Sequence, residues 1–310
     1  MSGVDKRTPN TGHAYSARMT SSPSSFRVLV SNSTDPYVNL ATEEWLLDRA
    51  SDADPVLLLW QSEPTVVIGK NQNPWRECRL GWMKRRGIRL ARRVSGGGAV
   101  FHDAGNLNYA FFVPRVVYDA DAVFDLIVGV LADLGFEAKR VNRTSLAVGG
   151  LKVSGNAFCL RRNGAMHHGT LLVESDLHAL AEALRPSPWA YETRATESIR
   201  ASVRNLSTTD APLSMEQVRD AFVARCGAGR AHAPTAEDLP ARMAVLQSEA
   251  WLYRQTPPFI ARLTNSKGVD IAVEVKKGLV TQVTCRSRPT ESALRSAWLG
   301  RRFDPDAMGR

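Results

Sequence analysis

The 310-residue sequence contains few cysteines, and they lie far apart. The four are Cys78, Cys159, Cys226 and Cys285, with no Cys-x-x-Cys pair and no nearby Cys/His pair at zinc spacing. This excludes a disulfide-stapled scaffold and predicts free thiols in a reducing compartment. No apolar run approaches the roughly 20 residues that a membrane span needs, so no transmembrane helix and no membrane partner are predicted.

Acidic residues are in the minority. The chain has 31 Asp and Glu against 40 Lys and Arg, a formal net charge of +9. A composition of 44% hydrophobic and 23% charged residues is that of an ordinary folded protein and excludes wholesale disorder. The positive charge indicates an anionic partner, which leaves nucleic acid, an anionic metabolite and an acidic protein surface all open.

Residues 1–25 lack the apolar core of a secretory signal. They carry Lys6, Arg7 and Arg18 against a single acid, Asp5, among many Ser, Thr and Pro. Two interpretations remain: a disordered tail, or a transit peptide that would direct the protein to the mitochondrial matrix. The alternative location is the cytoplasm.

Order is expected from Phe26 onward, with short strands and helices that do not alternate strictly, which favours an α+β fold with a mixed sheet. Val56–Trp60 and Thr65–Ile68 are expected to form a hairpin. Asn39 is expected to cap a helix with Glu43 and Glu44 in its first turn. The other predicted helices cover 74–87, 121–134, 176–184 and 214–226, and further strands cover 26–30, 88–93, 98–102, 107–113, 137–141, 144–148, 151–154 and 167–173.

A second, smaller domain is predicted toward the C-terminus. Gly, Ala and Pro crowd residues 227–240, which indicates a linker between a main domain at 26–226 and an accessory domain at 241–310. Within the latter, two alternating runs flank Lys277-Gly278, a hairpin signal.

The most informative stretch runs from Arg92 to Asp103 and reads RRVSGGGAVFHD. Three consecutive glycines let backbone amides approach a ligand, and arginine binds phosphate or carboxylate, so the stretch predicts an anion cradle. The alternative is a glycine-rich hairpin with surface arginines. The chain has no GxxxxGK[ST], and Phe101 occupies the last glycine position of GxGxxG, so a nucleotide site here is neither a P-loop nor a Rossmann site.

Lys152 lies in a short strand-like run bounded by glycines, with Ser154 two residues on and therefore on the same face. A lysine in such a site neutralises charge when a carboxylate attacks a phosphate. The alternative is a solvent-facing lysine on an edge strand. His167 and His168 are adjacent in a strand and point to opposite faces, so they cannot readily bind one metal, and no metal ligand is predicted.

Taken together, these segments resemble lipoate–protein ligase A and its relatives, the lipoyltransferases. The matching stretches occur in the family's order at 39–44, 59–61, 66–75, 90–108, 151–157 and 167–172. The resemblance implies the biotin/lipoyl ligase α+β fold, with a catalytic domain at 26–226. It also implies a two-step reaction, in which lipoate attacks ATP to give lipoyl-adenylate and a protein lysine then accepts the lipoyl group.

The resemblance also assigns site residues, with Lys152 as the catalytic residue. ATP with Mg²⁺ is the implied cofactor and lipoate the implied substrate. The loop from Phe158 to Met166 is expected to cover the adenylate. The lipoyl pocket is expected at Trp60, Gly97, His102 and His168, and the ATP and lipoyl-adenylate site at Arg93, Ser95, Gly96, Gly97, Gly98, Ala99, Val100, Phe101, Asn106, Lys152, Ser154, Ala157 and Thr170.

The implied partners are lipoyl domains of 2-oxoacid dehydrogenase acyltransferase subunits and the glycine-cleavage H protein, bound by a monomer. The basic segment 76–93, with Arg85 and Arg86, is a candidate docking face for them. One alternative is a lipoyl or octanoyl transferase that adenylates poorly. Another is a basic nucleic-acid-binding protein, but no aromatic stacking platform or recognisable module supports it, so no nucleic-acid partner is predicted.

Overall fold

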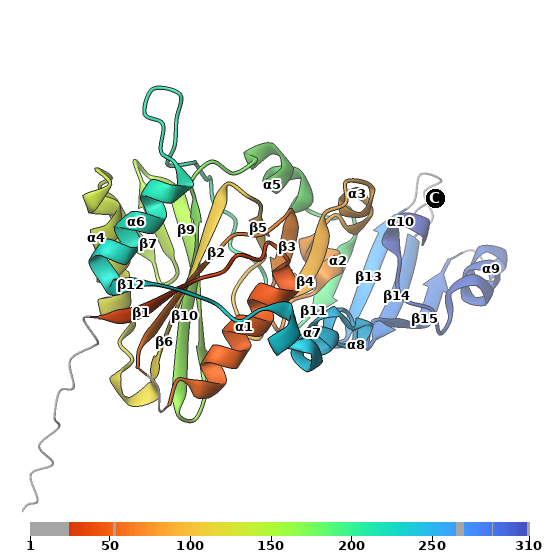
Figure 1. Cartoon of the computed structure of the whole chain (residues 1–310). Helices are drawn as coiled ribbons and strands as arrows, with labels where there is room; N and C mark the ends of the chain where they lie inside the picture. The colour runs from red at the N-terminus through yellow and green to blue at the C-terminus, as the bar shows by residue number, and fades with distance from the viewer. Residues whose placement is uncertain (1–24, 52–53, 265–269, 287, 309–310) are drawn as a thin grey trace, which may run out of the picture.

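The computed structural model describes residues 25–51, 54–264, 270–286 and 288–308, and Figure 1 shows its two parts. The predicted tail or transit peptide at 1–25 lies outside the described residues apart from Ser25. The larger part is built on an eight-stranded sheet and the smaller on a four-stranded sheet. The expectation of an α+β fold with a mixed sheet is confirmed.

The large sheet combines two parallel pairs with an antiparallel remainder. β1 pairs in parallel with both β12 and β2, while the pairs from β2 to β7 are antiparallel. Its strands, in spatial order, are β12 (Gly227–His232), β1 (Phe26–Val30), β2 (Val56–Trp60), β6 (Asn106–Pro114), β10 (Gly164–Leu172), β9 (Leu151–Leu160), β8 (Ser145–Val148) and β7 (Ala138–Asn142).

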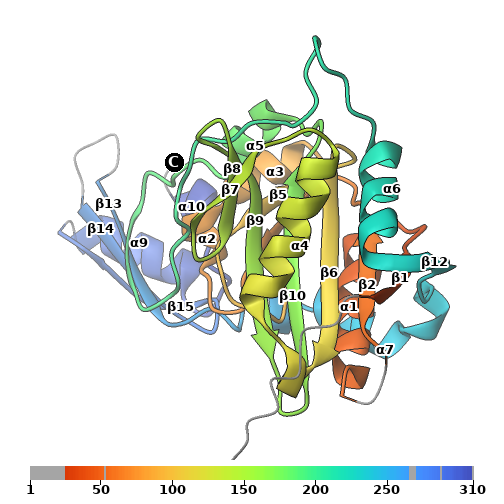
Figure 2. The same ribbon diagram turned by 90° about the vertical axis from the view of Figure 1, so that its left-hand side faces the viewer.

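Helices cover both faces of this sheet (Figures 1 and 2). α4 (Ala120–Asp133) and α6 (Met215–Cys226) lie on one face, and α1 (Pro36–Arg49) lies on the other. In β2, Leu57 and Leu59 join the core under α4 and α6, whereas Leu58 and Trp60 join the core under α1. A strand buried on both faces reads as a continuous apolar run, as Val56–Trp60 does. The predicted helix 121–134 is confirmed.

A separate three-stranded sheet contains β4 (Arg89–Arg92), β3 (Thr65–Ile68) and β5 (Val100–His102). The predicted hairpin between β2 and β3 is therefore wrong: β3 pairs in parallel with β4, and β2 pairs with β1 and β6. Both strands are buried throughout, so their apolar runs carry no alternation that would indicate their partners.

The predicted start of the first helix is also wrong. α1 begins at Pro36, with the carboxylate of Asp35 accepting hydrogen bonds from the amides of Tyr37 and Val38. Asn39 is buried inside the helix and donates to the carbonyls of Ser33 and Gln61. This shift of one turn moves Glu43 from the expected first turn to the middle of the helix, where its side chain is buried and 2% exposed.

The smaller part contains β11 (Ala190–Thr193), β13 (Phe259–Thr264), β14 (Asp270–Lys276) and β15 (Leu279–Cys285), with α9 (Arg288–Trp298) and α10 (Pro305–Met308). The hairpin around Lys277-Gly278 is confirmed, and both residues have positive φ, at 51° and 72°. β11 comes from the range expected to be the main domain, so this sheet joins segments from both sides of the expected boundary.

Residues 227–240, which were expected to form a linker, instead contain an edge strand of the large sheet and lead directly into a helix. Gly227–His232 form the edge strand β12 of the large sheet. The chain then continues through α7 (Pro240–Gln247), which packs on α1, and α8 (Glu249–Leu252). Strand pairing with β1 supplies backbone partners that the glycine-rich composition gave no reason to expect.

The predicted basic helix at 74–87 is two shorter helices, α2 (Pro74–Glu77) and α3 (Leu80–Arg85). Asn73 caps α2, as predicted. Arg76 pairs with Glu77 and Arg79 with Glu182, so these arginines are engaged within the protein. Lys84, Arg85 and Arg86 remain exposed.

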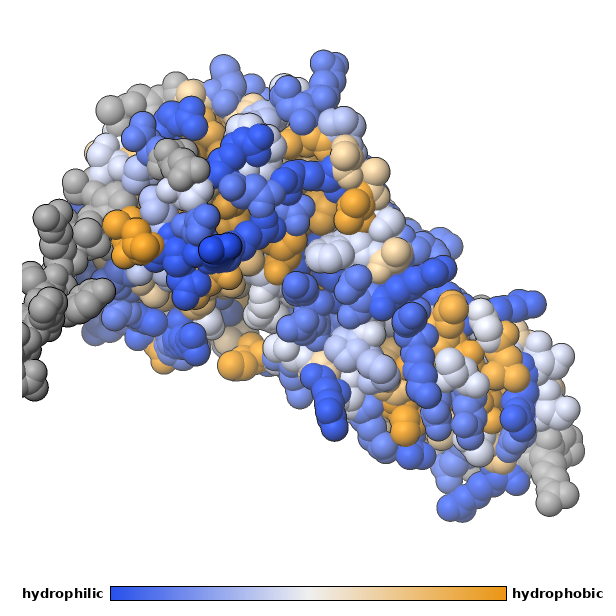
Figure 3. Space-filling view, turned by 90° about the horizontal axis from the view of Figure 1, so that it is seen from below, coloured by the Kyte–Doolittle hydropathy of each residue, from blue (hydrophilic) through white to orange (hydrophobic). Residues whose placement is uncertain are grey.

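Seen from below, hydrophilic residues are spread over the surface and hydrophobic residues form separate groups among them (Figure 3). Within the part of the chain that the structure describes, no helix combines the length and hydrophobicity needed to cross a bilayer.

Candidate active site

Two adjoining cavities meet at Lys152. The first cavity has a volume of about 230 Å³ and reaches inward to Glu43, Trp60 and His168. The second cavity has a volume of about 380 Å³ and is lined by apolar side chains of α5 (Leu177–Ala183) together with Arg185 and Arg200. The residues that line both are Ala99, Val100, Lys152, Gly155, Thr170, Ser198 and Ile199.

The guanidinium of Arg93 organises the glycine-rich loop from inside. Its Nη2 donates to the carbonyls of Gly96 at 2.6 Å and Gly98 at 2.7 Å, and its Nε donates to Ser95 Oγ at 3.0 Å. Burial lowers the pKa of Arg93 to about 10, so it remains charged at neutral pH. The loop is therefore held around a buried cation. Because Arg93 also lines the first cavity, its positive charge favours binding of an anion there.

Two glycines are required by this arrangement. Gly97 has φ +85°, and a Cβ there would lie 2.9 Å from Nη2 of Arg93. A side chain at Gly69 would clash with the backbone carbonyls of Gly96 and Gly97. The predicted close approach of backbone in this loop is thus present, between the loop and the end of β3.

Arg92 does not contribute to the anion cradle. It is fully buried and points away from the loop, donating to the carbonyls of Lys70 and Gln72 at 2.9 Å and to that of Leu252 at 2.6 Å. It also donates to Thr256 Oγ1 at 3.0 Å. Of the two arginines that precede the glycines, Arg93 alone faces the site, and Arg92 ties β4 to the segment from Leu252 to Thr256, which leads into the smaller part.

The inner end of the first cavity is closed by a hydrogen-bonded chain of buried side chains. Glu43 accepts from Trp60 Nε1 at 3.1 Å and from His168 Nδ1 at 2.8 Å. His168 Nε2 lies 2.7 Å from Ser95 Oγ. A carboxylate only accepts, so Nδ1 of His168 carries a proton, and in a neutral ring Nε2 accepts the hydroxyl proton of Ser95.

Glu43 is a site residue that the sequence analysis missed as such. Glu43 lies in a stretch that matches the family, but the prediction placed it in the first turn of a helix capped by Asn39, where it would complement the helix dipole. The signal that could have found it is helical spacing: Glu43 lies one turn after Leu40, and both side chains line the first cavity.

Lys152 is the residue at which the two cavities join. Its backbone N–H donates to the carbonyl of Ser202 at 2.9 Å, and its carbonyl accepts from the N–H of Arg204 at 3.0 Å. A Cβ at Gly155 would lie 3.1 Å from Lys152 Nζ, so the lysine side chain runs over a glycine. The ammonium makes no hydrogen bond or ion pair with another described residue, and burial lowers its pKa.

The predicted common face of Lys152 and Ser154 is altered by an irregularity in the pairing of β8 and β9 between these residues. Ser154 is buried, and its hydroxyl lies 2.8 Å from the Tyr109 hydroxyl, which also donates to Asn156 Oδ1 at 2.7 Å. His167 Nε2 reaches the same Asn156 oxygen at 3.1 Å. This buried network supports the strand that carries Lys152.

The adjacent histidines point to opposite sides of β10, as predicted. His168 enters the first cavity, whereas His167 packs between the rings of Phe124 and Phe158, at centroid distances of 4.9 and 4.6 Å. Among the described residues, no group of three or more His, Cys, Asp or Glu side chains is placed to hold a metal ion.

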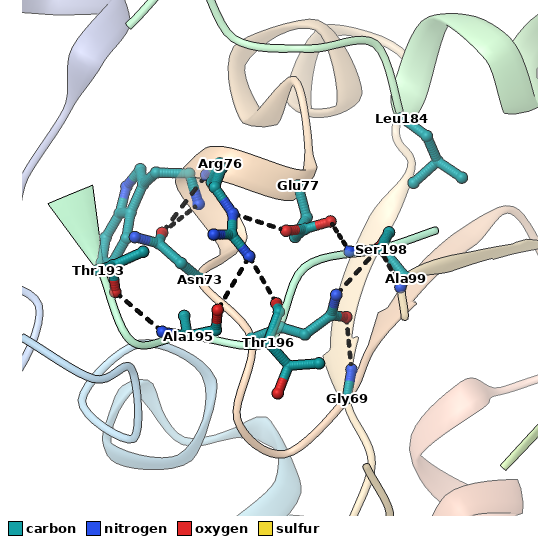
Figure 4. Close-up of polar contacts among 12 residues, drawn as sticks. Gly69, Asn73, Arg76, Glu77, Ala99, Leu184, Thr193, Ala195, Thr196 and Ser198 are labelled. Carbon is teal, nitrogen blue, oxygen red and sulfur yellow. Dashed lines mark hydrogen bonds and ion pairs between the residues drawn. The ribbon is translucent and has the colours of Figure 1, made fainter. Parts of the chain in front are cut away.

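A segment without regular structure, residues 194–203, crosses the entrance to both cavities. Figure 4 shows how it is anchored: Arg76 donates to the carbonyls of Ala195 and Thr196, and Glu77 accepts from the N–H of Ser198. Ser198 Oγ accepts from the Ala99 N–H at 2.8 Å and from Gln72 Nε2 at 3.0 Å. The segment is thus tied directly to the glycine-rich loop.

This segment takes the place expected for the loop from Phe158 to Met166. That expectation is wrong, because those residues form the ends of β9 and β10 and a short turn, and none of them lines either cavity. The segment 194–203 has no periodic pattern and no recognisable motif, so its sequence does not indicate a site residue.

Most predicted site residues surround the two cavities. Phe101 and Ser154 line the second cavity alone, while Ser95, Gly96 and Asn106 line neither. Ser95 holds His168, Gly96 supplies a carbonyl to Arg93, and Asn106 donates to the carbonyl of Phe101 at 2.9 Å. The predicted residues that line the first cavity are Trp60, Arg93, Gly97, Gly98, Ala99, Val100, His102, Lys152, Ala157, His168 and Thr170.

Comparison with known proteins gives the family. Residues 35–227, more than half of the chain, match the model of the lipoyl protein ligase A/B catalytic domain. The chain belongs to this family. That match includes every residue of the two cavities and leaves most of the C-terminal part outside it.

Relatives in the lipoyl protein ligase A/B family carry the name lipoate-protein ligase A. The chain is 41% identical over 197 residues to the protein of Psychrobacter cryohalolentis, covering 64% of this chain and 58% of that relative. It is 37% identical over 248 residues to the protein of Bdellovibrio bacteriovorus, covering 75% of this chain and 73% of that relative. A solved structure of lipoate-protein ligase A bound with ATP is 25% identical and superposes with a TM-score of 0.62, covering 73% of this chain and 98% of that one.

Proposed function

We propose that this chain is an ATP-dependent lipoate–protein ligase, which activates lipoate to lipoyl-adenylate and transfers the lipoyl group to a protein lysine. The observation that carries the proposal is the position of Lys152, whose ammonium has no partner among the described residues and lies at the junction of two cavities. One cavity ends in a closed, buried chamber and suits an acyl chain. The other cavity is lined by Ala99–Phe101, apolar side chains and two arginines, and it suits a nucleotide.

In the first step, a carboxylate oxygen of lipoate attacks the α-phosphorus of ATP. An oxygen–phosphorus bond forms, the bond to the β-phosphate bridge breaks, and pyrophosphate leaves. No protein nucleophile is needed, because orientation and charge neutralisation supply the acceleration. Lys152 is placed to hold the carboxylate and the α-phosphate together, and the buried charge of Arg93 favours the anionic reactants.

In the second step, a neutral lysine amine of the acceptor attacks the acyl carbonyl. An amide bond forms, AMP leaves with the bonding electrons, and the amine loses a proton to solvent. The described residues that line the two cavities include no cysteine, which supports direct transfer over a thioester intermediate. The proposed acceptors are lipoyl domains of 2-oxoacid dehydrogenase complexes and the glycine-cleavage H protein.

Mg²⁺ is proposed to enter with ATP. The absence of a clustered set of metal-binding side chains among the described residues does not fit a resident magnesium site. The triphosphate oxygens would be its ligands, and we derive no step through the ion.

The test is a ligation assay with the purified chain, ATP, Mg²⁺, lipoate and apo H protein. We expect lipoylated acceptor and AMP in equal amounts. Product from preformed lipoyl-adenylate, with none from lipoate and ATP, would show a transferase that does not adenylate. No product from either donor would overturn the proposed function.

Acceptor docking is proposed at the exposed cations Lys84, Arg85 and Arg86 of α3 and its C-terminal end. Reversing Arg85 and Arg86 to Glu is expected to raise the KM for an acidic acceptor and leave lipoyl-adenylate formation unchanged. An unchanged KM would show that these residues are only a solvated surface. The monomeric state and the location in the mitochondrial matrix stay predictions, and the bacterial origin of the two named relatives gives the latter no support.

A further inference from the structure

The short helix α2 contacts both parts of the molecule. Its start is fixed by Asn73, whose Oδ1 accepts from the N–H of Trp75 at 3.0 Å and from that of Arg76 at 3.4 Å. The next side chain, Trp75, faces the smaller part. Arg76 and Glu77 face the segment 194–203, which crosses the entrance to both cavities. Three consecutive residues therefore connect the smaller part to the site.

Trp75 belongs to the core of the smaller part, although α2 lies in the larger part by its position in the chain. The side chain is buried, and its ring centroid lies 5.5 Å from that of Phe259 and 5.8 Å from that of Phe303. A Cβ at Gly278, in the turn between β14 and β15, would lie 3.3 Å from Cη2 of Trp75. Because the smaller part encloses this ring, its core determines where α2 lies.

Arg76 and Glu77 hold three backbone groups of the segment with charges of opposite sign (Figure 4). Nη2 of Arg76 donates to the carbonyl of Thr196 at 2.6 Å and to that of Ala195 at 3.2 Å. Oε2 of Glu77 accepts from the N–H of Ser198 at 3.2 Å. The two side chains also pair with each other, with Nε of Arg76 2.9 Å from Oε1 of Glu77. Each charge therefore fixes the orientation of the other as well as part of the segment.

The segment brings this support to the cavities through Ser198, which lines both of them. Its Oγ accepts from the N–H of Ala99 in the glycine-rich loop at 2.8 Å, and a Cβ at Gly98 would lie only 3.0 Å from the same oxygen. The segment and the loop are thus in close contact. Neither Trp75 nor Arg76 lines either cavity, so these two residues act on the site through the segment.

We propose that Trp75 and Arg76 are positioning residues for nucleotide binding. The core of the smaller part seats Trp75, and Arg76 together with Glu77 holds the segment where Ser198 meets the glycine-rich loop. The smaller part thereby supports the site, although no described residue of its sheet lines either cavity. This rests on the proposed function, in which the nucleotide is ATP. Loss of either contact is expected to raise the KM for ATP more than it lowers kcat, because the substitution leaves Lys152 in place.

The first experiment is a double-mutant cycle between Arg76→Met and Ser198→Ala in the adenylation assay. Methionine keeps an unbranched apolar side chain but removes both donations to the segment, so each single variant is expected to raise the KM for ATP at least about tenfold. If both residues act through the same segment, the increase in the double variant is well below the product of the two single increases. Arg76→Lys keeps a cation that can donate to a carbonyl and is expected to recover part of the loss.

Two results of this cycle would overturn the proposal. One is an unchanged KM for ATP in Arg76→Met. The other is an increase in the double variant equal to the product of the two single increases, because the effects would then be independent. Failure of the wild-type protein to adenylate lipoate would overturn the proposed function instead, which keeps the two failures distinct.

The second experiment tests the contribution of the smaller part. Trp75→Phe keeps an aromatic ring but fills less of the space beside Gly278, and it is expected to raise the KM for ATP at least about threefold. The matched control is Val283→Ala, which removes buried methyl groups from the same core at a residue outside α2. It is expected to lower the Tm by a comparable amount and to leave the KM for ATP as in the wild type. A parallel rise in KM in both variants would show that core stability alone sets it and would contradict the proposal.

Discussion

Oε2 of Glu43 lies 2.8 Å from Nδ1 of His168, in a chamber where both side chains are almost completely buried. The other oxygen of the same carboxylate accepts from Trp60. One carboxylate therefore fixes the orientation of two rings that line the first cavity.

Glu43→Gln should break this arrangement while conserving size. An amide cannot accept from both rings at once, because one of its two ends is a donor. We expect kcat/KM for lipoate to fall about 10- to 100-fold, mainly through KM, because a hydrogen bond to a charged group is worth about 1.5–3 kcal/mol. Steady-state kinetics measure this. The control is Glu44→Gln, whose carboxylate pairs with Arg161 and Arg242 outside the cavities and whose loss should change kcat/KM less than about twofold.

Ser198→Ala should loosen the segment 194–203 from the glycine-rich loop. It removes the acceptor of the Ala99 N–H and of Gln72 Nε2. Each of these two partly buried hydrogen bonds is worth about 0.5–1.5 kcal/mol, so we expect an increase of at least about tenfold in the KM for ATP. The exposed Ser202→Ala is the control, because Ser202 contributes only its backbone carbonyl to Lys152. An unchanged KM for ATP in Ser198→Ala would show that the hydroxyl does not hold the segment in place.

Lys152 should control the alkaline side of the pH profile. Burial lowers its pKa below that of an ordinary lysine, so the ammonium loses its proton, and the site its charge, at a lower pH than a solvent-exposed lysine would. We expect Lys152→Ala to abolish adenylation. Lys152→Arg should retain weak activity with an alkaline limb displaced to higher pH, because arginine keeps its charge. The measurement is kcat/KM from pH 6 to 11, and an alkaline limb at the same pH in Lys152→Arg would argue against Lys152 as its origin.

The buried histidines should make the protein sensitive to acid. Burial lowers the pKa values of His102 and His167 to about 3, below the ordinary value of 6.5. Between these limits the unfolded chain binds protons that the folded protein does not, so the free energy of unfolding falls as the pH falls. Each histidine contributes at most about 1.4 kcal/mol per pH unit.

Denaturant unfolding at a series of pH values between 7 and 4 measures this slope. His167→Gln should reduce the slope of the unfolding free energy with pH by the contribution of one buried histidine. The exposed His178→Gln should leave it as in the wild type, since that side chain is in water in both states. An equal slope in all three proteins would show that the two buried rings do not determine acid sensitivity.

The sequence predicted the parts of this molecule that have a local cause. The periodic apolar residues of α4, the Asn73-Pro74 start of α2 and the turn at Lys277-Gly278 depend on neighbours along the chain, and all three are present. The pairing of β2 and β3 depends on residues far away. Since both strands are buried on both faces, nothing within them indicated two different sheets.

The same distinction holds for the site. The glycine-rich loop and Lys152 were found because glycines and a lone lysine are visible in the sequence. Glu43 was missed, since its role depends on where α1 begins and on rings contributed by β2 and β10. Ser198 was missed because its partners, Gln72 and Ala99, come from distant segments, and nothing about an isolated serine indicates them.

The burial of Arg92 also decides how the chain can be divided. The guanidinium belongs to the larger part by position, but the carbonyl of Leu252 and the hydroxyl of Thr256 that solvate it belong to the segment leading into the smaller part. A fragment that stopped at residue 226 would lose those acceptors and open the site of Arg92 to water. We therefore expect the two parts to unfold together, so that cutting the chain between its sheets does not yield a stable catalytic core.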